Sequence, residues 1–243
     1  MSEAWTDIVG DPGSGMLLIG DHASNHLPDG YDLGVPHWVM AQHVAIDIGV
    51  APLGRALCAS LGCPGILGGI SRLLIDLNRE EDAAGLIPET SDGHSIPGNA
   101  GLDPVERNKR IAAYWRPYHD HIAEMIEAGR PKLMISLHSF TPRLATSDAE
   151  RPWQIGILYN ADERAARLAL PLLAQAGIVA GDNLPYSGKV LNATMNRHGE
   201  ANAIPYLGIE VRQDLISDEA GVARWGERLA PIIRAVRNGL GST

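Results

Sequence analysis

Three side chains that can bind a metal or transfer a proton follow buried, strand-like runs. His22 comes shortly after the apolar run 16–20, His138 directly follows the run 132–137, and Glu210 directly follows the run 206–209. Open α/β sheets bind ligands outside the carboxyl ends of their strands. The three positions therefore predict one polar site at the edge of a mainly parallel sheet.

His22 and His138 are the leading candidates for metal ligands. Neutral imidazole is a common zinc ligand, and a catalytic zinc ion typically takes three protein ligands and one water. For each residue the alternative is a hydrogen-bonded loop histidine that binds no metal.

Asp47 is the candidate third ligand. It lies in a stretch, 41–61, whose pattern predicts a helix, so His43 and Asp47 would share one helical face at i, i+4. An aspartate between two isoleucines is costly on a buried face unless it is paired or bound to a metal, although it could also be exposed. His43 could itself be a ligand or could orient Asp47, and Asn25 is a weaker candidate.

Two arginines flank a short apolar run, 73–75, that predicts a strand. The planar fork of arginine fits a carboxylate, so Arg72 or Arg79 could anchor an acidic substrate. The alternative is a structural ion pair with Asp76.

Glu210 is the candidate general base, because a carboxylate beside a metal site can take a proton from water. Arg212 could orient Glu210 or stabilise the oxyanion of a tetrahedral intermediate, or it could pair with Glu210 in a salt bridge. His198 is either a substrate contact or a solvated loop residue.

Strand-like and helix-like segments alternate along the chain, which favours a single α/β domain over residues 1–243 with a mainly parallel or mixed sheet. Residue 52 is a proline, so the first predicted helix starts late, kinks or is broken. The long segment 78–102 is irregular, and such loops usually serve function or are disordered. The predicted strands are 15–20, 64–70, 132–137, 153–159 and the run ending at 210, and the predicted helices are 41–61, 103–128, 161–176, 193–202 and 217–238.

The formal charge of −9 disfavours a nucleic-acid partner or an anionic membrane surface. Two cysteines, Cys58 and Cys63, cannot form a disulfide framework or a cysteine-rich zinc site. No stretch reaches the length of a membrane span, and the N-terminus lacks the features of a secretion signal. These properties predict a cytoplasmic protein.

Eight short blocks together resemble the N-formylglutamate amidohydrolase family, and more closely its shorter bacterial branch. They run in order over most of the chain, from about residue 16 to about residue 230. The blocks are Asp21-His22-Ala-Ser-Asn25, His43-Val-Ala-Ile-Asp47-Ile-Gly49, Ser71-Arg72-Leu-Leu-Ile-Asp76-Leu-Asn78-Arg79, Ser91-Asp-Gly93 with Ile96-Pro-Gly-Asn99, Leu137-His138-Ser-Phe140-Thr-Pro142, Arg151-Pro-Trp153, Asp182-Asn183-Leu-Pro-Tyr186 and Ile209-Glu210-Val-Arg212-Gln-Asp-Leu215.

The resemblance implies a three-layer, phosphorylase/hydrolase-like α/β fold related to zinc-dependent exopeptidases. It also implies hydrolysis of an N-formyl or similar N-acyl group from an acidic amino acid, as in the last step of one histidine-degradation route. Asn25 stands where carboxypeptidase-type enzymes carry a glutamate ligand, which favours Asp47 as the acidic ligand. The Asn78-Arg79 pair resembles their carboxylate-binding pair, and Glu210 resembles their catalytic glutamate.

The leading hypothesis is therefore a zinc-dependent amidohydrolase that releases formate from a substrate such as N-formyl-L-glutamate. Its zinc ligands are His22, Asp47 and His138. The predicted substrate-binding residues are Arg72, Asn78, Arg79 and His198, and the predicted catalytic residues are Glu210 and Arg212. The rival hypotheses are the same chemistry on another N-acyl amino acid or a small peptide-like amide, and a non-catalytic protein that binds an acidic metabolite.

Overall fold

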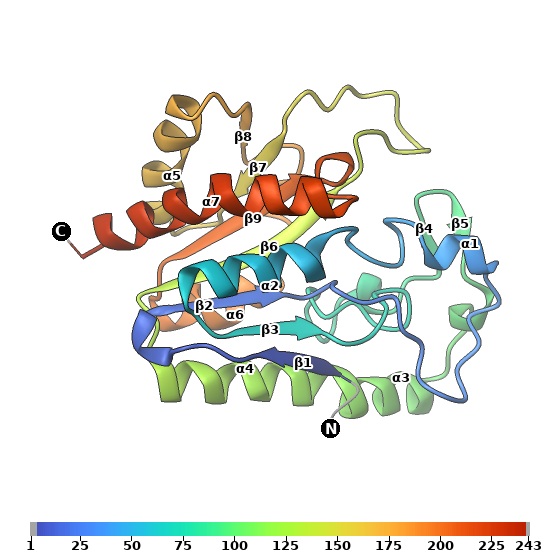
Figure 1. Ribbon diagram of the computed structural model, residues 1–243. Helices are drawn as coiled ribbons and strands as arrows, with labels where there is room; N and C mark the ends of the chain where they lie inside the picture. The colour runs from blue at the N-terminus through green and yellow to red at the C-terminus, as the bar shows by residue number, and fades with distance from the viewer. Residues whose placement is uncertain (1–3, 242–243) are drawn as a thin grey trace.

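The computed structural model describes residues 4–241 and is built around a seven-stranded mixed sheet (Figure 1). Its strand order is β1-β3-β2-β6-β9-β7-β8. The strands β2, β3, β6 and β9 are parallel, whereas β1 and β7 run antiparallel to their neighbours β3 and β9. The carboxyl ends of four strands thus meet at one edge. The bounds are β1 Trp5–Ile8, β2 Met16–Gly20, β3 Gly65–Gly68, β6 Leu133–Phe140, β7 Ile155–Leu158, β8 Ala180–Asp182 and β9 Tyr206–Arg212.

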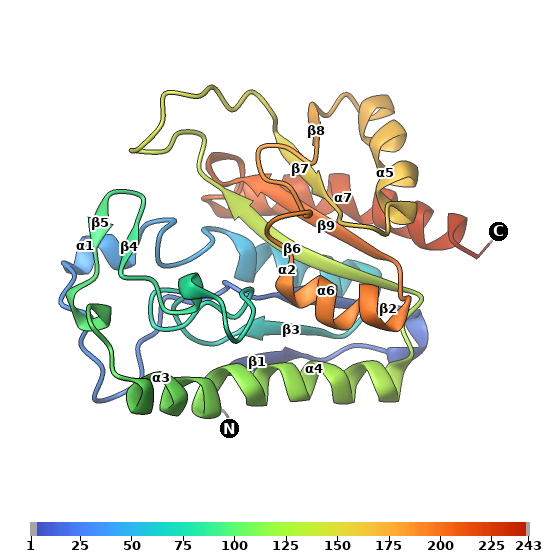
Figure 2. The ribbon, with the colours of Figure 1, turned by 180° about the vertical axis from the view of Figure 1, so that it is seen from behind.

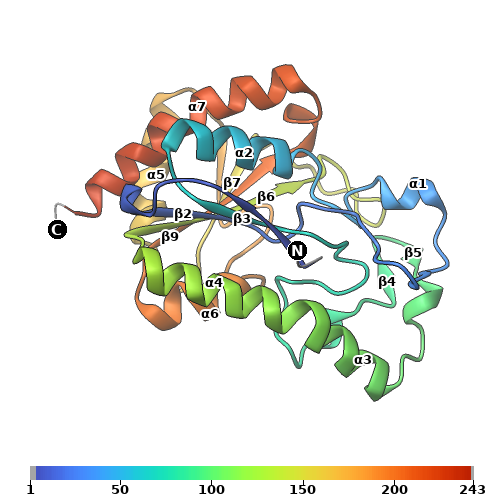
Figure 3. The same cartoon turned by 60° about the horizontal axis from the view of Figure 1, so that its bottom comes forward.

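Helices cover both faces of this sheet. Helices α2 (Val50–Leu61) and α7 (Glu219–Gly239) lie on one face, and α4 (Arg116–Gly129) and α6 (Ala193–His198) lie on the other (Figure 3). Helix α5 (Arg164–Gln175) packs beside α7. Because both faces are covered, all eight residues of the central strand β6 are buried, and their sequence shows no polar–apolar alternation.

The remaining elements lie mainly at the end of the sheet where the parallel strands finish (Figure 2). Helix α1 spans His37–Met40, and a two-stranded hairpin joins β4 (Thr90–Ser91) to β5 (His94–Ser95). Helix α3 (Pro104–Arg110) continues through a wide π-helical turn, Ile111–Trp115, into α4. Pro117 lacks the N–H that a regular helix would need there, and the wide turn accommodates its ring.

The predicted α/β fold with a mixed sheet between helices is confirmed. Five of the predicted strands are present, but β6 and β9 extend beyond His138 and Glu210, so these residues lie inside their strands rather than after them. The sequence patterns missed β1 and β8, which are short edge strands. No helix within residues 4–241 has the length and apolar character needed to cross a membrane. Residues 1–3, part of the N-terminus tested for a secretion signal, lie outside the described residues, as do residues 242–243.

The helix predicted over 41–61 starts late, which is one of the outcomes that Pro52 indicated, and the first half of the range is not helical. Residues 41–49 form turns, and α2 begins only at Val50, after Gly49 in a left-handed conformation with φ 83°. Pro52 is tolerated because it occupies the first turn of the helix, where no backbone donor is required. His43 and Asp47 therefore do not share a helical face.

The segment that carries Arg72 and Arg79 is also not a strand. Residues 72–74 and 77–78 form turns, and buried polar side chains hold their backbone in place. Asn99 donates to the Leu73 carbonyl at 2.8 Å and Arg110 donates to the Leu74 carbonyl at 3.1 Å. Sequence periodicity could not reveal this, because the supporting residues come from distant parts of the chain.

His198 is neither a solvated loop residue nor a residue of the polar site. It is buried at the end of α6, where its ring stacks on His119 of α4 with centroids 5.2 Å apart. His119 Nε2 lies 3.0 Å from the Leu77 carbonyl, and His119 Nδ1 lies 3.0 Å from His198 Nε2. Donation from His119 to Leu77 leaves its Nδ1 to accept from His198, so both rings are neutral in this arrangement.

We predict that this pair makes the fold sensitive to acid. Burial lowers the pKa of His119 to about 3 and that of His198 to about 4, from a usual value of 6.5. Below pH 6.5 these two histidines bind protons in the unfolded chain but not in the folded chain. The stability that the neutral pair contributes is therefore fully present above pH 6.5 and is lost as the pH falls. Each proton contributes up to about 1.4 kcal/mol per pH unit.

Denaturant unfolding of metal-free protein between pH 7.5 and pH 5 measures this loss. The variant His119→Gln should show a shallower dependence of unfolding free energy on pH than wild type. Equal slopes in wild type and His119→Gln would contradict the prediction.

Candidate metal and catalytic site

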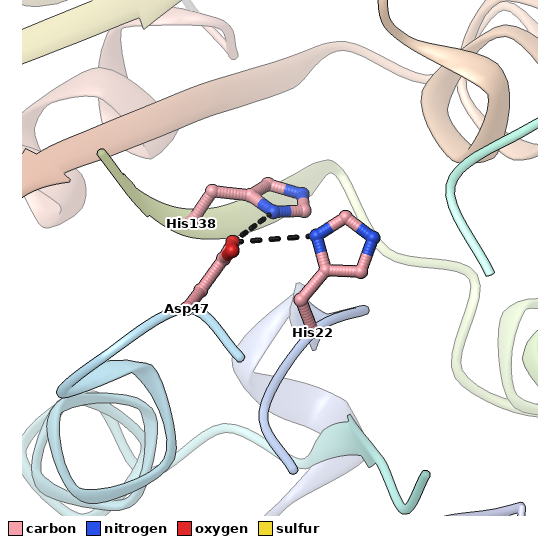
Figure 4. Close-up of side chains that lie close together, drawn as sticks. All are labelled: His22, Asp47 and His138. Atoms are coloured by element: carbon pink, nitrogen blue, oxygen red, sulfur yellow. Dashed lines mark hydrogen bonds and ion pairs between the residues drawn. The ribbon is translucent and has the colours of Figure 1, made fainter. Parts of the chain in front are cut away.

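Three of the predicted site residues converge on one point, as Figure 4 shows for His22, Asp47 and His138. Asp47 Oδ2 lies 2.8 Å from His138 Nδ1 and 3.3 Å from His22 Nδ1. Their potential ligand atoms all lie within 4.8 Å of one another, and all three residues are buried. Two imidazole nitrogens and one carboxylate oxygen form a donor set typical of catalytic zinc. The triad could therefore hold a metal ion.

The backbone around the strand ends positions this triad. His22 follows β2 by two residues, and His138 lies in the neighbouring strand β6. Asp47 reaches them from the turn before α2, because its backbone N–H donates to the His22 carbonyl at 2.9 Å. Ser139 holds the same turn by donating to the Ile48 carbonyl at 2.8 Å.

Both histidines place their other ring nitrogen against a second carboxylate. His22 Nε2 lies 2.7 Å from Asp76 Oδ1, and His138 Nε2 lies 3.2 Å from Asp21 Oδ2. Tyr118 donates to Asp21 Oδ1 at 2.8 Å, which helps to fix that carboxylate. Metal-binding histidines commonly donate their remote N–H to a carboxylate, which leaves the nearer nitrogen free for the metal. The surroundings of the triad therefore fit a metal ion.

Asp21 was not among the residues predicted for the site, and Asp76 was predicted only as a partner for arginine. The available signal for Asp21 was its position: it directly follows β2 and precedes His22, yet it is fully buried. Its role depends on Tyr118 and Thr194, which donate to it from α4 and α6 at 2.8 Å and 3.0 Å.

The carboxylates control the charge of the buried histidines. Burial and Arg72 lower the pKa of His22, but Asp76 and Asp47 outweigh them and raise it overall. Burial likewise lowers the pKa of His138, but its ion pair with Asp21 and its hydrogen bond to Asp47 raise it well above the usual value. Without a metal, the carboxylates therefore favour protonated rings.

Arg72 is an internal partner of this cluster. Its guanidinium lies 3.1 Å from Asp47 Oδ1 and 3.0 Å from Asp76 Oδ2, so it bridges the two carboxylates that contact His22. By engaging Oδ1 it leaves Oδ2 of Asp47 facing the histidines. Although Arg72 lines the cavity described below, this geometry agrees with the alternative of a structural ion pair.

Glu210 stands beside the triad with one oxygen unpaired. It is the register partner of His138 across the β6–β9 pair, and it is buried. Among residues 4–241, its Oε2 atom is buried without a hydrogen-bond partner. Burial and the nearby Asp47 raise its pKa to about 7, against the lowering influence of His138 and Arg72. A carboxyl group with such a pKa can both accept and donate a proton near neutral pH.

A cavity of about 190 Å³ joins these groups. Two further predicted residues, Asn78 and Arg79, contribute to its wall. The Arg79 guanidinium is partly exposed and makes one ion pair among the described residues, a long contact of 3.8 Å with Asp76. The lining residues are His22, His43, Asp47, Arg72, Asn78, Arg79, Ser136, His138, Ser139, Phe140, Thr141, Leu158, Tyr186, Leu191, Asn192, Gly208, Ile209 and Glu210.

Other predicted candidates do not join the triad. Arg212 points its guanidinium to Asp214 at 2.8 Å and does not line the cavity, and neither does His198. Asn25 donates to the Met40 carbonyl at 2.7 Å. His43 lines the cavity, but its Nε2 pairs with Asp92 at 3.0 Å rather than with Asp47.

Comparisons with known proteins agree with this fold. The model of the N-formylglutamate amidohydrolase family matches residues 14–217. Gene product Atu2144 from Agrobacterium tumefaciens is 29% identical, with a TM-score of 0.89 over 98% of this chain and 95% of its own. The N-formylglutamate amidohydrolase from Ralstonia eutropha JMP134 is 18% identical, with a TM-score of 0.80 over 99% of both chains, and so shares the fold. No curated protein sequence matches the chain.

Fold and site together define a mixed α/β protein with a His-Asp-His cluster that could bind a metal at its sheet edge. The family model spans most of this sequence. The chain therefore belongs to the N-formylglutamate amidohydrolase family, and the resemblance noted in its sequence blocks is confirmed.

We predict that the triad binds one divalent metal ion per chain, with zinc as the test ion. His138→Ala should abolish stoichiometric zinc binding, because it removes a ligand atom. Asp21→Asn should weaken zinc binding by about 10- to 100-fold, because His138 loses the carboxylate that orients its ring.

Competition with a chelating dye measures the zinc affinity of each variant. His43→Gln is the matched control, since this cavity histidine pairs with Asp92 and should leave zinc affinity unchanged. Full zinc stoichiometry in His138→Ala, or loss of zinc in His43→Gln, would refute the ligand set.

Proposed function

We propose that the protein hydrolyses the amide bond of an N-formyl or similar N-acyl derivative of an acidic amino acid, with a divalent metal held by His22, Asp47 and His138. N-formyl-L-glutamate, which would give formate and glutamate, is the leading substrate. Family membership supports this reaction class. The single observation that carries the proposal is the unpaired, buried Oε2 of Glu210 beside the metal-capable triad.

A zinc ion at this triad would act as a Lewis acid on the amide and on the attacking water. Glu210 would take a proton from that water as its oxygen bonds to the acyl carbon. It would then deliver the proton to the amide nitrogen as the C–N bond breaks, which releases formate and the amine. Burial raises the pKa of Glu210 above the usual range of a carboxyl group, which favours a side chain that both accepts and donates this proton.

Arg79 is the stronger candidate for the substrate carboxylate. Arg72 is already held by two carboxylates at 3.1 Å and 3.0 Å, whereas Arg79 makes only the 3.8 Å contact with Asp76 among the described residues. Asn78 is beside it, with Nδ2 3.5 Å from His138 Nε2. The α-carboxylate of the substrate would therefore bind on the β6 side of the cavity, near His138.

Glu210→Gln tests the general base. We expect kcat to fall by at least about 10²-fold, because general acid–base groups typically contribute that much or more. Zinc content and substrate affinity should stay near wild type, since Gln keeps the size of the side chain. The exposed Glu124→Gln on α4 is the control and should be fully active.

Formate release from a panel of N-formyl and N-acetyl amino acids measures the activity. Wild-type turnover in Glu210→Gln would refute the base assignment. Zinc-loaded wild-type protein that binds N-formyl-L-glutamate without cleaving it would favour a metabolite-binding protein instead.

Arg79→Gln tests the carboxylate anchor. We expect KM for N-formyl-L-glutamate to rise by about 10- to 100-fold, since a hydrogen bond to a charged group is worth about 1.5–3 kcal/mol. With the α-amide of the same substrate, wild type and Arg79→Gln should have similar KM values. An equal rise in KM with both substrates would show that Arg79 does not bind the substrate carboxylate.

A further inference from the structure

Two arginine–tyrosine pairs in this protein share one geometry. The Arg151 guanidinium lies over the Tyr186 ring, 4.9 Å from its centroid, and Arg151 Nη1 donates to the Tyr186 hydroxyl at 3.1 Å. Arg167 lies over Tyr159 at the same 4.9 Å, and its Nη2 donates to the Tyr159 hydroxyl at 2.6 Å. In both pairs the hydroxyl oxygen accepts from arginine, so its own proton is available for another acceptor.

The two pairs differ in the acceptor that is available to the tyrosine hydroxyl proton. Tyr159 donates to Asp182 Oδ1 at 2.6 Å and does not line the catalytic cavity. Tyr186 lines the cavity, and no hydrogen bond among residues 4–241 gives its proton an acceptor. Tyr186 therefore presents an unused hydroxyl donor in the cavity that contains Glu210.

The loop that carries Tyr186 is held tightly against the sheet. Asn183 Oδ1 accepts from the backbone N–H groups of Tyr159 at 3.0 Å and Gly188 at 3.1 Å. At Gly156 in β7, a Cβ atom would collide with the Leu184 carbonyl oxygen, so only glycine permits this close approach. These contacts with β7 and with its following residue Tyr159 therefore fix the position of the loop.

Register places this loop on a defined side of the reacting groups. Gly156 is the register partner of Glu210, which is in turn the register partner of His138. The Tyr186 loop covers the β7 side of Glu210, whereas Asn78 contacts His138 on the β6 side. A substrate with its carboxylate at Asn78 and Arg79 would therefore direct its acyl group toward Tyr186.

The environment keeps Tyr186 protonated. Burial raises its pKa, and this outweighs the lowering effect of the hydrogen bond from Arg151. The phenol is thus a donor and not a base at neutral pH. Donation from the arginine polarises the O–H bond and strengthens it as a donor, because linked hydrogen bonds reinforce one another. Arg151 also donates to the Thr141 carbonyl at 3.0 Å, which fixes it beside the end of β6.

We infer that Tyr186 is a catalytic residue whose hydroxyl donates a hydrogen bond to the carbonyl oxygen of the scissile amide. This oxygen gains negative charge as water adds to the acyl carbon, so the bond strengthens toward the transition state. Arg151 is the positioning residue that orients the hydroxyl. The inference rests on the proposed amide hydrolysis and adds to it a donor on the acyl side of the substrate.

The test compares Tyr186→Phe with Tyr159→Phe, which removes the hydroxyl of the matched pair outside the cavity. For Tyr186→Phe we expect kcat to fall by about 10²-fold, the usual effect of losing one donor to an oxyanion, with KM within about 3-fold of wild type. Its zinc content and the pH dependence of kcat should be unchanged, because Tyr186 does not titrate in the reaction. Tyr159→Phe should keep the wild-type kcat.

Arg151→Gln tests the positioning role. It should lower kcat by less than Tyr186→Phe does, and adding it to Tyr186→Phe should cause no further loss. Calorimetry on the Glu210→Gln background gives a readout without turnover: adding Tyr186→Phe should weaken binding of N-formyl-L-glutamate by a few-fold at most, since the bond is made mainly in the transition state.

The outcomes separate this inference from the proposed function. If wild type hydrolyses an N-acyl amino acid and Tyr186→Phe keeps its kcat, or changes only KM, the inference is wrong and the function stands. Equal losses in Tyr186→Phe and Tyr159→Phe would indicate a structural effect and also overturn it. If wild type neither binds nor hydrolyses any N-acyl amino acid, the proposed function fails and the inference fails with it.

Discussion

Charge balance among buried side chains governs the whole site. Three carboxylates and one guanidinium surround the two histidines, and each of these groups has an oppositely charged neighbour within about 3.3 Å. Removing one partner from such a cluster leaves a buried, uncompensated charge, which typically costs about 3–5 kcal/mol. The members of the cluster therefore stabilise one another electrostatically; they are Asp21, His22, Asp47, Arg72, Asp76 and His138.

The same network directs one oxygen and two nitrogens toward a single point. Asp21 and Asp76 engage the Nε2 atoms of the histidines, and Arg72 engages Oδ1 of Asp47. What remains is the inward set of two Nδ1 atoms and one Oδ2 atom. These outer contacts thus leave only the inward atoms available to bind a metal. Because Tyr118 of α4 and Thr194 of α6 donate to Asp21, the orientation of the His138 ring also depends on how these helices pack.

Strand register then aligns the groups that would act on a substrate. His138, Glu210 and Gly156 form one row across β6, β9 and β7. The two side chains of this row supply a possible ligand and an unpaired carboxyl group, and the missing side chain at Gly156 admits the loop of Tyr186. Because strands in a sheet cannot slip by one residue without turning every side chain over, this row is rigidly specified.

Local sequence patterns were enough to predict the fold class and the family, and they singled out His22, His138 and Glu210 as candidates for one site. These features are local: a buried strand is a short apolar run, and the polar residue near its end stands out against that run. Asp47 was identified correctly as a member of the cluster, but for a wrong reason, since it lies in a turn and not on a helix.

The choice of polar residues that share the site depends instead on how distant segments pack. Arg72 is bound internally, Arg212 and His198 are directed away from the cavity, and Asp21 and Tyr186 enter the site through partners far along the chain. Residue type and spacing cannot distinguish these cases, because the ionisation and orientation of a buried polar group depend on the neighbours that folding brings to it.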